Sequence, residues 1–329
     1  MTGAFFWIFA QPSLNTPIAS GRGRDHTGDM PNRRTFLHGL SASALAGALP
    51  VKAATDSPRN RLCFFSKHLQ GLSFDDIASV AAEVGINGIE APIRPKGHIE
   101  PERVPDELPK FVEALKKQGL EMTILTSGIT EVSAEQHTES VLRTAAQLGI
   151  KRFRMGVTKY DLKLPIWPQL EAAKPKIKDL VALSRELGIL PLFQNHSGKD
   201  YMGAPVWDVY SMMRDYPPGQ FSFAFDILHA TVEGGLSWPL HFQLVSDHIG
   251  AAYLKDFKWV GRKIETCPLG EGQVNPAYGK MLMESGYQGP ISLHVEYLKG
   301  DAKDPAVLKS FRDAHQRDLG VVREWLAQK

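Results

Sequence analysis

The sequence is poor in several features that would place it in a large protein class. Only two of its 329 residues are cysteines, Cys63 and Cys267, so no disulfide framework or cysteine-rich metal cluster is expected. We expect both thiols to be buried or inert. Basic residues number 38 and acidic residues 36, which gives no basis for binding nucleic acid or an anionic membrane. The motifs of nucleotide-binding loops, serine hydrolases and HExxH metalloproteases are also missing.

The N-terminal residues are interpreted as lying outside the folded domain. A twin-arginine motif (NRRTFL, residues 32–37) is followed by a mildly apolar run and by the small residues Ala53 and Ala54. Residues 30–54 are therefore predicted to be a cleavable twin-arginine signal peptide, and the mature protein to be periplasmic and free of the membrane. Residues 1–29 are interpreted as an upstream extension before the true start at Met30. The alternative is a basic leader with a chance Arg-Arg pair.

From residue 61 the chain alternates short apolar runs with longer segments of helical period. Strands are predicted over residues 62–65, 86–93, 122–126, 152–156, 190–196, 221–226, 249–257 and 290–297. Helices are predicted near residues 74–84, 104–118, 134–148, 169–187, 206–215, 238–247, 276–285 and 305–327. Eight β-then-α units without a long gap favour a closed barrel over a doubly wound sheet. The predicted fold is α/β, a single (β/α)8 TIM barrel over residues 61–327 that follows the signal segment.

Polar side chains close several of the predicted strands. The apolar run 221–225 ends on Asp226, with His229 three residues later. A charged group at the end of a buried strand costs several kcal/mol unless it is paired. The same feature recurs at Gln194-Asn195-His196, Lys255-Asp256 and His294-Val295-Glu296. Because the carboxyl ends of barrel strands form the active-site face, these side chains are predicted to meet in one site.

Several segments resemble the xylose-isomerase-like TIM-barrel superfamily. They are SKHLQ (66–70), IRPKGH (93–98), QNHSG (194–198), DILHAT (226–231), KDF (255–257), PLGEG (268–272) and GPISLHVEY (289–297). Within it the chain is similar to the exported branch known as sugar phosphate isomerases/epimerases, often with twin-arginine leaders. The resemblance covers roughly residues 61–327. It implies an enzyme that acts on a carbohydrate.

The resemblance also implies a metal site. In the ketose 3-epimerases of this superfamily, Glu, Asp, His and Glu from strands five to eight hold Mn²⁺ or Mg²⁺. The matching positions here are Gln194, Asp226, Lys255 and Glu296. Gln194 offers only a neutral carbonyl, and a protonated lysine cannot ligate a metal, so His196 or His229 would have to replace a lost ligand. The predicted metal ligands are therefore Asp226, Glu296, His196 and Gln194, with Zn²⁺ or Co²⁺ also tolerated.

Three residues are predicted to be catalytic. Glu296 is the acid/base candidate, and His229 is expected to orient or polarise the substrate. Lys255 has two interpretations: a cation that stabilises an enediolate oxygen, or a base with a lowered pKa. Asp256 is more simply a loop-capping residue.

A further set is predicted to bind the substrate: Arg94, His98, Lys67, Asn195 and Trp238. Arg94 and His98 follow the second strand, where an arginine can bind hydroxyl groups or a carboxylate. Trp238 could stack on a sugar ring or simply pack at the start of a helix.

The predicted function is isomerisation or epimerisation of a sugar, keto-sugar or cyclitol by metal-assisted proton abstraction next to a carbonyl. Because Gln194 replaces one acid/base glutamate, a lyase or dehydratase is the alternative. A non-catalytic sugar-binding barrel and a relative of the apurinic-site endonucleases are two further hypotheses. The near-neutral charge argues against a DNA substrate. The expected partner is a small carbohydrate, and the oligomeric state is not predicted.

Overall fold

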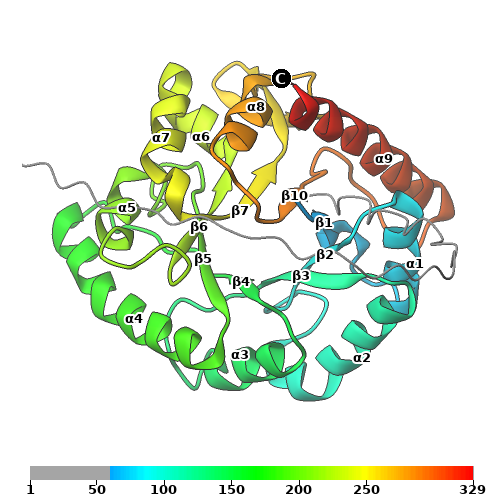
Figure 1. Ribbon diagram of the computed structural model, residues 1–329, viewed down its shortest axis with the longest axis horizontal. Coiled ribbons are helices and arrows are strands. Elements are labelled where there is room, and N and C mark those ends of the chain that lie inside the picture. The colour runs from blue at the N-terminus through cyan, green and yellow to red at the C-terminus, as the bar shows by residue number, and fades with distance from the viewer. Residues whose placement is uncertain (1–59, 329) are drawn as a thin grey trace, which may run out of the picture. The chain divides into compact units, whose positions relative to one another are not determined.

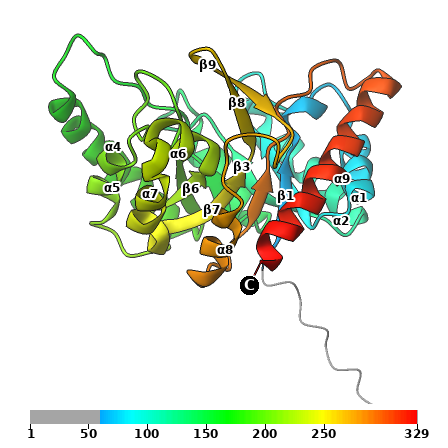
Figure 2. The same ribbon diagram turned by 90° about the horizontal axis from the view of Figure 1, so that it is seen from above.

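The computed structural model describes residues 60–328, which form a barrel surrounded by helices (Figures 1 and 2). The predicted signal peptide 30–54 and upstream extension 1–29 lie outside the described residues. Eight parallel strands close the barrel in the order β1-β10-β7-β6-β5-β4-β3-β2. These are β1 (Leu62–Phe65), β2 (Gly88–Pro92), β3 (Glu121–Thr126), β4 (Arg152–Arg154), β5 (Leu190–Gln194), β6 (Ser222–Asp226), β7 (Ile249–Leu254) and β10 (Ile291–Leu293).

Helices cover the outside of the barrel, which Figure 1 views nearly end-on. They are α1 (Phe74–Val84), α2 (Val104–Lys117), α3 (Thr138–Gln147), α4 (Ile166–Leu187), α5 (Trp207–Met213), α6 (Ile227–Gly234), α7 (Trp238–Val245), α8 (Ala277–Glu284) and α9 (Pro305–Ala327). The predicted eight-stranded α/β barrel is confirmed, and the predicted bounds of β1, α1 and α9 match those observed. Gly85 and Gly188 end α1 and α4 with φ angles of 81° and 67°, the left-handed conformation that glycine adopts without strain.

The predicted strand 249–257 is wrong in its last three residues. β7 ends at Leu254, and after Lys255 the chain enters an antiparallel hairpin, β8 (Asp256–Val260) and β9 (Lys263–Cys267), which projects above the barrel in Figure 2. Val260 pairs with Lys263 across a two-residue turn in which Gly261 has a φ of 62°, the geometry that hairpin turns favour. Helix α6 was also missed; the Asp226 carboxylate caps it by accepting the backbone N–H of His229.

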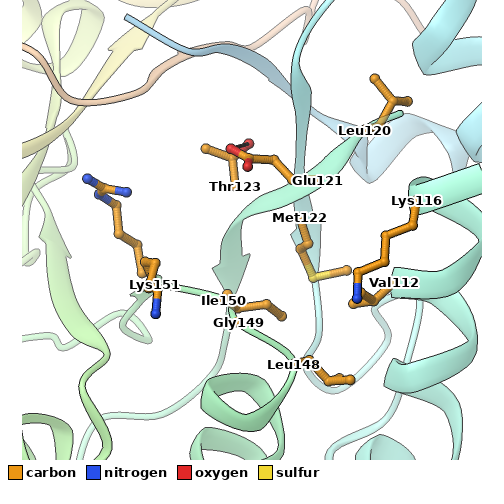
Figure 3. A pocket seen from close by; sticks show the side chains of 11 residues that line it. Val112, Lys116, Leu120, Glu121, Met122, Thr123, Leu148, Gly149, Ile150 and Lys151 are labelled. Carbon is orange, nitrogen blue, oxygen red and sulfur yellow. Dashed lines mark hydrogen bonds between the residues drawn. The ribbon is translucent and has the colours of Figure 1, made fainter. Parts of the chain in front are cut away.

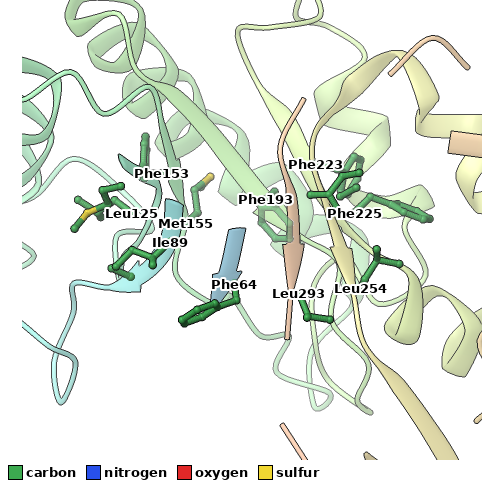
Figure 4. Close-up of a cluster of buried hydrophobic side chains, with 14 of the residues drawn as sticks. Phe64, Ile89, Leu125, Phe153, Met155, Phe193, Phe223, Phe225, Leu254 and Leu293 are labelled. Atoms are coloured by element: carbon green, nitrogen blue, oxygen red, sulfur yellow. The ribbon is translucent and has the colours of Figure 1, made fainter. Parts of the chain in front are cut away.

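The barrel strands have two different faces because successive side chains alternate. The outward side chains, such as Phe64, Ile89, Phe193 and Phe225, are buried against the helices and form the main core (Figure 4). The inward face holds a smaller apolar layer. Its residues are Cys63, Ile124, Leu192, Ala224, Ala251 and Tyr253. Residues two positions further along several of these strands are polar, so the alternation that builds the core also delivers charged side chains to the carboxyl ends.

Both cysteines are free and buried, as expected. Within residues 60–328, no helix combines the length and the hydrophobicity needed to cross a membrane.

Candidate active site

A buried lysine joins two carboxylates at the carboxyl ends of three adjacent strands. The Lys255 ammonium follows β7 and lies 3.0 Å from Oδ2 of Asp226, at the end of β6, and 3.2 Å from Oε2 of Glu296, beyond β10. Asp226 is fully buried and Lys255 is 5% exposed, whereas the Glu296 side chain is 34% exposed. The predicted meeting of Asp226 and Glu296 therefore occurs through a cation of the chain itself.

This arrangement fixes the charge of Lys255 and Glu296. Burial favours the neutral form of Lys255, but Asp226 and Glu296 outweigh it and raise the pKa of the ammonium. Burial would likewise raise the pKa of Glu296, but Lys255, with a contribution from His294, lowers it to about 2. The raised pKa of Lys255 favours its interpretation as a cation that stabilises charge over that of a base with a lowered pKa.

Gln194 does not offer its oxygen to this centre. Its amide nitrogen donates to Oδ2 of Asp226 at 2.8 Å, and its oxygen accepts from Arg154 at 2.8 Å. Arg154, at the end of β4, lies 3.7 Å from Oε1 of Glu90 on β2. A continuous line of polar contacts therefore crosses the barrel from Glu90 to Glu296.

Glu90, at one end of this line, is buried and surrounded by hydrogen-bond donors. Its carboxylate is fully buried and accepts hydrogen bonds from the hydroxyls of Thr126, Tyr253 and Ser292, at 2.5, 2.9 and 2.7 Å. His294 adds a contact of 3.0 Å to Oε2. Burial would raise the pKa of Glu90, but His294, Arg154 and the hydrogen bond from Thr126 lower it to about 2. Glu90 is therefore an anion that holds the barrel interior together.

Two histidines stand beside the lysine centre. The rings of His196 and His229 stack at 4.0 Å, and His196 also stacks on Tyr201 at 4.5 Å. Nδ1 of His229 contacts the Ser197 hydroxyl at 2.8 Å, while Nε2 lies 3.5 Å from Asp226 without a hydrogen-bond partner among the described residues. Burial, with the nearby Lys255 charge, lowers the pKa of both histidines. Both are neutral at physiological pH.

The predicted metal ligands do not fit an ion in this arrangement. In the part of the chain that the structure describes, no group of three or more His, Cys, Asp or Glu side chains could hold a metal. The Lys255 ammonium occupies the point between Asp226 and Glu296, Gln194 points its amide N–H at Asp226, and His196 is stacked on its neighbours. A divalent cation at this point would meet a fixed positive charge.

Glu296 lies in the wall of a cavity of about 540 Å³ at the carboxyl end of the barrel. Phe65, Lys67, His68, Thr266 of the β8–β9 hairpin and Lys299 are also among its lining residues. A smaller cavity of about 100 Å³, shown in Figure 3, lies between the amino-terminal ends of β3 and β4 and the helices α2 and α3. It contains none of the predicted site residues. The cavity of about 540 Å³ at the carboxyl end of the barrel is therefore the candidate substrate site.

The other predicted substrate residues have different environments. Lys67 lines the cavity, and the half-buried Arg94 lies over the ring of Phe65 with its guanidinium carbon 6.0 Å from the ring centre. His98 instead contacts the hydroxyl and carbonyl of Ser66 through Nε2, at 2.9 and 3.1 Å. Burial lowers the pKa of His98 to about 4.

Asn195 and Trp238 are not available to a substrate. The Asn195 amide is fully buried and makes both of its hydrogen bonds to the backbone of Asp226, at 2.8 and 3.0 Å. These two hydrogen bonds join the ends of β5 and β6. Trp238 is buried at the start of α7 and packs edge-on against Tyr278, with the ring centres 6.2 Å apart. Its burial favours packing at the start of the helix over stacking on a sugar ring.

Asp256 caps a loop, as its sequence context indicated. Its carboxylate accepts hydrogen bonds from the backbone N–H groups of Phe257, Gly270, Gly272 and Val274, at 2.8–3.0 Å. A Cβ on Gly272 would lie 2.3 Å from Oδ1 of Asp256, so only glycine fits there. The Gly-rich segment 268–272 is thus shaped around a buried carboxylate.

Glu90, Arg154 and Tyr253 belong to the site but are not among the residues predicted from the sequence. Glu90 interrupts the apolar strand β2, and Arg154 follows Phe153 in β4. A charged residue of inward parity within a buried strand is the signal that would have found both. The partners of Glu90 lie up to 204 positions away in sequence, and only the closed barrel brings them together.

The family model described as "Xylose isomerase-like TIM barrel" matches residues 78–315. No curated protein matches the chain by sequence.

Several solved structures share the fold. D-psicose 3-epimerase from Clostridium cellulolyticum H10 superposes with a TM-score of 0.62 at 11% identity, covering 81% of this chain and 99% of that one. The probable 3-DHS dehydratase AsbF from Bacillus anthracis gives 0.61 at 16% identity, with 80% and 98% covered. The IOLI protein, solved with a bound zinc atom, gives 0.63 at 14% identity, with 81% and 98% covered. Identities this low establish the fold and leave the activity to be argued from the site.

Proposed function

Because the chain belongs to the xylose isomerase-like TIM-barrel family, we propose that it is an enzyme that moves a proton next to the carbonyl of a sugar, keto-sugar or cyclitol. Glu296 is the proton-transfer group, and Lys255 is the cation that stabilises the oxygen of the enediolate. One observation carries the proposal: a fixed ammonium is held by two carboxylates, one of which lies in the wall of the cavity. Relatives of the same fold include sugar 3-epimerases, which supports a carbohydrate substrate.

The proposed step needs only these two side chains. Glu296 takes a proton from the carbon next to the carbonyl, the C–H electrons form a C=C bond, and the carbonyl oxygen becomes anionic. The ammonium has three N–H donors, two of which face Asp226 and Glu296, so one is left for that oxygen. As negative charge moves from Glu296 to the substrate, Lys255 loses one anionic partner and gains another. The site's net charge is therefore unchanged during the transfer.

The arrangement favours a one-base reaction. Gln194, at the position of a second acid/base glutamate in the related epimerases, has both amide groups engaged by Arg154 and Asp226. Isomerisation between an aldose and a ketose can use a single base on one face of the enediol, whereas an epimerisation that inverts a carbon needs a proton donor on the opposite face. We therefore place isomerisation ahead of epimerisation.

The same observation supports a second candidate, β-elimination. After Glu296 has taken the proton, the C=C bond forms as the oxygen on the next carbon departs, and the Glu296 carboxyl returns the proton to it. His229 is neutral and partnered by Ser197, so it contributes orientation rather than an acidic proton. A structural relative of the chain is a probable dehydratase, which makes this outcome worth testing.

The experiment is solvent-exchange NMR of the full chain with aldoses, ketoses and 3-keto-glycosides in D₂O. Deuterium at the carbon next to the carbonyl, with or without conversion to an isomer, is the expected result. A product with new ultraviolet absorbance and one fewer hydroxyl would assign the lyase instead. Absence of both from every compound would overturn the proposal and favour a sugar-binding role.

The role of Lys255 makes a separate prediction about metals. Activity should survive dialysis against EDTA and should not rise on addition of Mn²⁺, Mg²⁺, Zn²⁺ or Co²⁺, because the ammonium supplies the stabilising charge. Loss of activity in EDTA, restored by one of these ions, would contradict this part of the mechanism.

We also propose that the protein is exported by the twin-arginine signal, which fractionation of cells carrying Arg33→Lys/Arg34→Lys would test.

A further inference from the structure

Arg94 is a half-buried cation without a partner. It follows β2 at the carboxyl end of the barrel, and its guanidinium makes no hydrogen bond or ion pair with any residue in the range 60–328. Partial burial and the neighbouring Arg154 both disfavour its charged form, while Glu90 and Glu296 favour it. Removing a guanidinium from water without giving it an anion is costly. The fold keeps Arg94 in this position without a protein anion to pair with it.

Arg94 lies close to two residues that line the cavity. Its guanidinium carbon lies 6.0 Å from the centre of the Phe65 ring, and Glu296 is close enough to influence its pKa. Phe65 and Glu296 are both part of the cavity wall. An anion bound in the cavity near Phe65 would therefore lie within reach of Arg94.

Two lysines add positive charge to the same wall. Lys67 and Lys299 line the cavity, and neither forms an ion pair with another described residue. Glu296 is the only acidic residue among the described residues that line it, and Lys255 already balances its charge. The cavity thus presents an excess of unpaired cations, whereas a site for a neutral sugar needs only hydrogen-bonding groups. Solvated lysines alone would not indicate an anionic ligand. The half-buried Arg94 does indicate one.

We propose that the substrate is anionic: a sugar or keto-sugar whose carboxylate, as in a uronic acid, is held by Arg94 with help from Lys67 and Lys299. The inference rests on the proposed function for the reaction that the substrate undergoes. Binding of the anion by Arg94 does not depend on that reaction. Arginine matches a carboxylate with two parallel N–H···O bonds, and it matches a phosphate in the same way. The shared chemistry is a terminal oxyanion, and the carboxylate and phosphate sources are separated by experiment.

The test compares matched sugars that differ only in the terminal group. Calorimetric binding is measured for three pairs: D-glucose and D-glucuronate, D-galactose and D-galacturonate, and D-mannose and D-mannuronate. D-glucose 6-phosphate is the phosphate probe. At least one uronate should bind about tenfold or more tightly than its neutral partner, the preference expected when one charge-assisted hydrogen-bonded pair is gained. The preference should fall as NaCl is raised, because an ion pair open to solvent is screened.

Variants assign the preference to Arg94. Arg94→Met should abolish it, and Arg94→Lys should keep the charge but lose several-fold in affinity, because a lysine cannot make the two-pronged contact. Arg214→Met removes an exposed arginine far along the chain, on the residue after α5, and should bind as the unaltered protein does. If Arg94→Met does not fold, Arg94→Lys still carries the test.

The outcomes separate this inference from the proposed reaction. Equal binding of every neutral and anionic pair, or a preference that Arg94→Met and Arg94→Lys both retain, would overturn the anion site even if deuterium exchange is seen with a neutral sugar. Tight, Arg94-dependent binding of a uronate without any exchange would support the anion site while the reaction fails. Preference for the 6-phosphate over every uronate would overturn the carboxylate assignment and leave a phosphate in its place.

Discussion

Glu90 and Glu296 are two carboxylates of one barrel that differ in burial and in hydrogen-bonding partners. Both have a pKa lowered to about 2, so both are anions at neutral pH. Glu90 is fully buried and accepts hydrogen bonds from three hydroxyls, with His294 beside it. Glu296 has the Lys255 ammonium as its hydrogen-bonding partner and is 34% exposed in the wall of the cavity. The same pKa therefore comes from two different causes.

The difference shows which carboxylate can react. Every oxygen of Glu90 is already occupied, and any proton it gained would break a hydrogen bond, so its charge stabilises the fold. Glu296 can turn to a substrate, because it has a single ion-pair partner and its side chain is partly exposed in the cavity wall. A low pKa alone thus does not mark a catalytic group; access and the number of partners decide.

Removing Lys255 should have the largest effect, because it takes the cation from both ends of the site. In Lys255→Met, Asp226 and Glu296 lose their shared partner, and the free energy of unfolding should fall by about 3–5 kcal/mol. Activity should disappear as well. Urea denaturation measures the loss, and Lys255→Arg, which keeps a cation, should lose less stability. Unchanged stability in Lys255→Met would mean that the buried pair is neutral.

Glu296→Gln should affect the reaction and spare the fold. Loss of a general base typically reduces the rate by about 10²–10⁴-fold, and the deuterium-exchange rate is the measurement. The melting temperature should change little, because Glu296 is partly exposed. Glu324→Gln, an exposed glutamate of α9, is the matched control and should keep full activity. A rate within a few-fold of the unaltered protein would remove Glu296 from the mechanism.

Glu90→Gln should show the reverse pattern. The neutral amide cannot accept from three hydroxyls as well as the carboxylate does, and its N–H groups meet donors, so stability should fall by about 2 kcal/mol. The remaining folded protein should still exchange deuterium at a measurable rate. If Glu90→Gln abolishes exchange at unchanged stability, the roles of the two carboxylates have been assigned the wrong way round.

The last prediction concerns the pH dependence of stability. Because the folded-state pKa of Glu90 is lowered to about 2, its stabilisation is fully present above the unfolded value of about 4.3 and is lost as the pH falls towards 2. In that window stability should drop by up to about 1.4 kcal/mol per pH unit for this group. Glu296 should add less, since solvent screens it. Thermal melts from pH 5 to pH 2.5 should show a shallower slope for Glu90→Gln, and equal slopes would contradict this account.

Much of the barrel could be predicted because local patterns determine it. Alternating apolar runs and helical segments placed the strands, and strand ends that carry Asp226, Lys255 and Glu296 pointed to the correct face of the barrel. The β8–β9 hairpin was missed because Phe257 follows β7 closely in the chain, and the predicted strand was extended to that residue. Glu90 and Arg154 were not predicted because both lie inside the predicted strands 86–93 and 152–156, where apolar packing is expected.

The sequence by itself determined which residues can meet: inward parity and strand-end position select Asp226, Lys255, Glu296 and Gln194, because side chains alternate along every strand. Only the tertiary structure decided what fills the centre. Closure of the barrel brings β6, β7 and β10 side by side, and the length of the lysine side chain then places its ammonium between two carboxylates. That outcome depends on strand register and on distances of about 3 Å between residues up to 41 positions apart, which no pattern in the chain encodes.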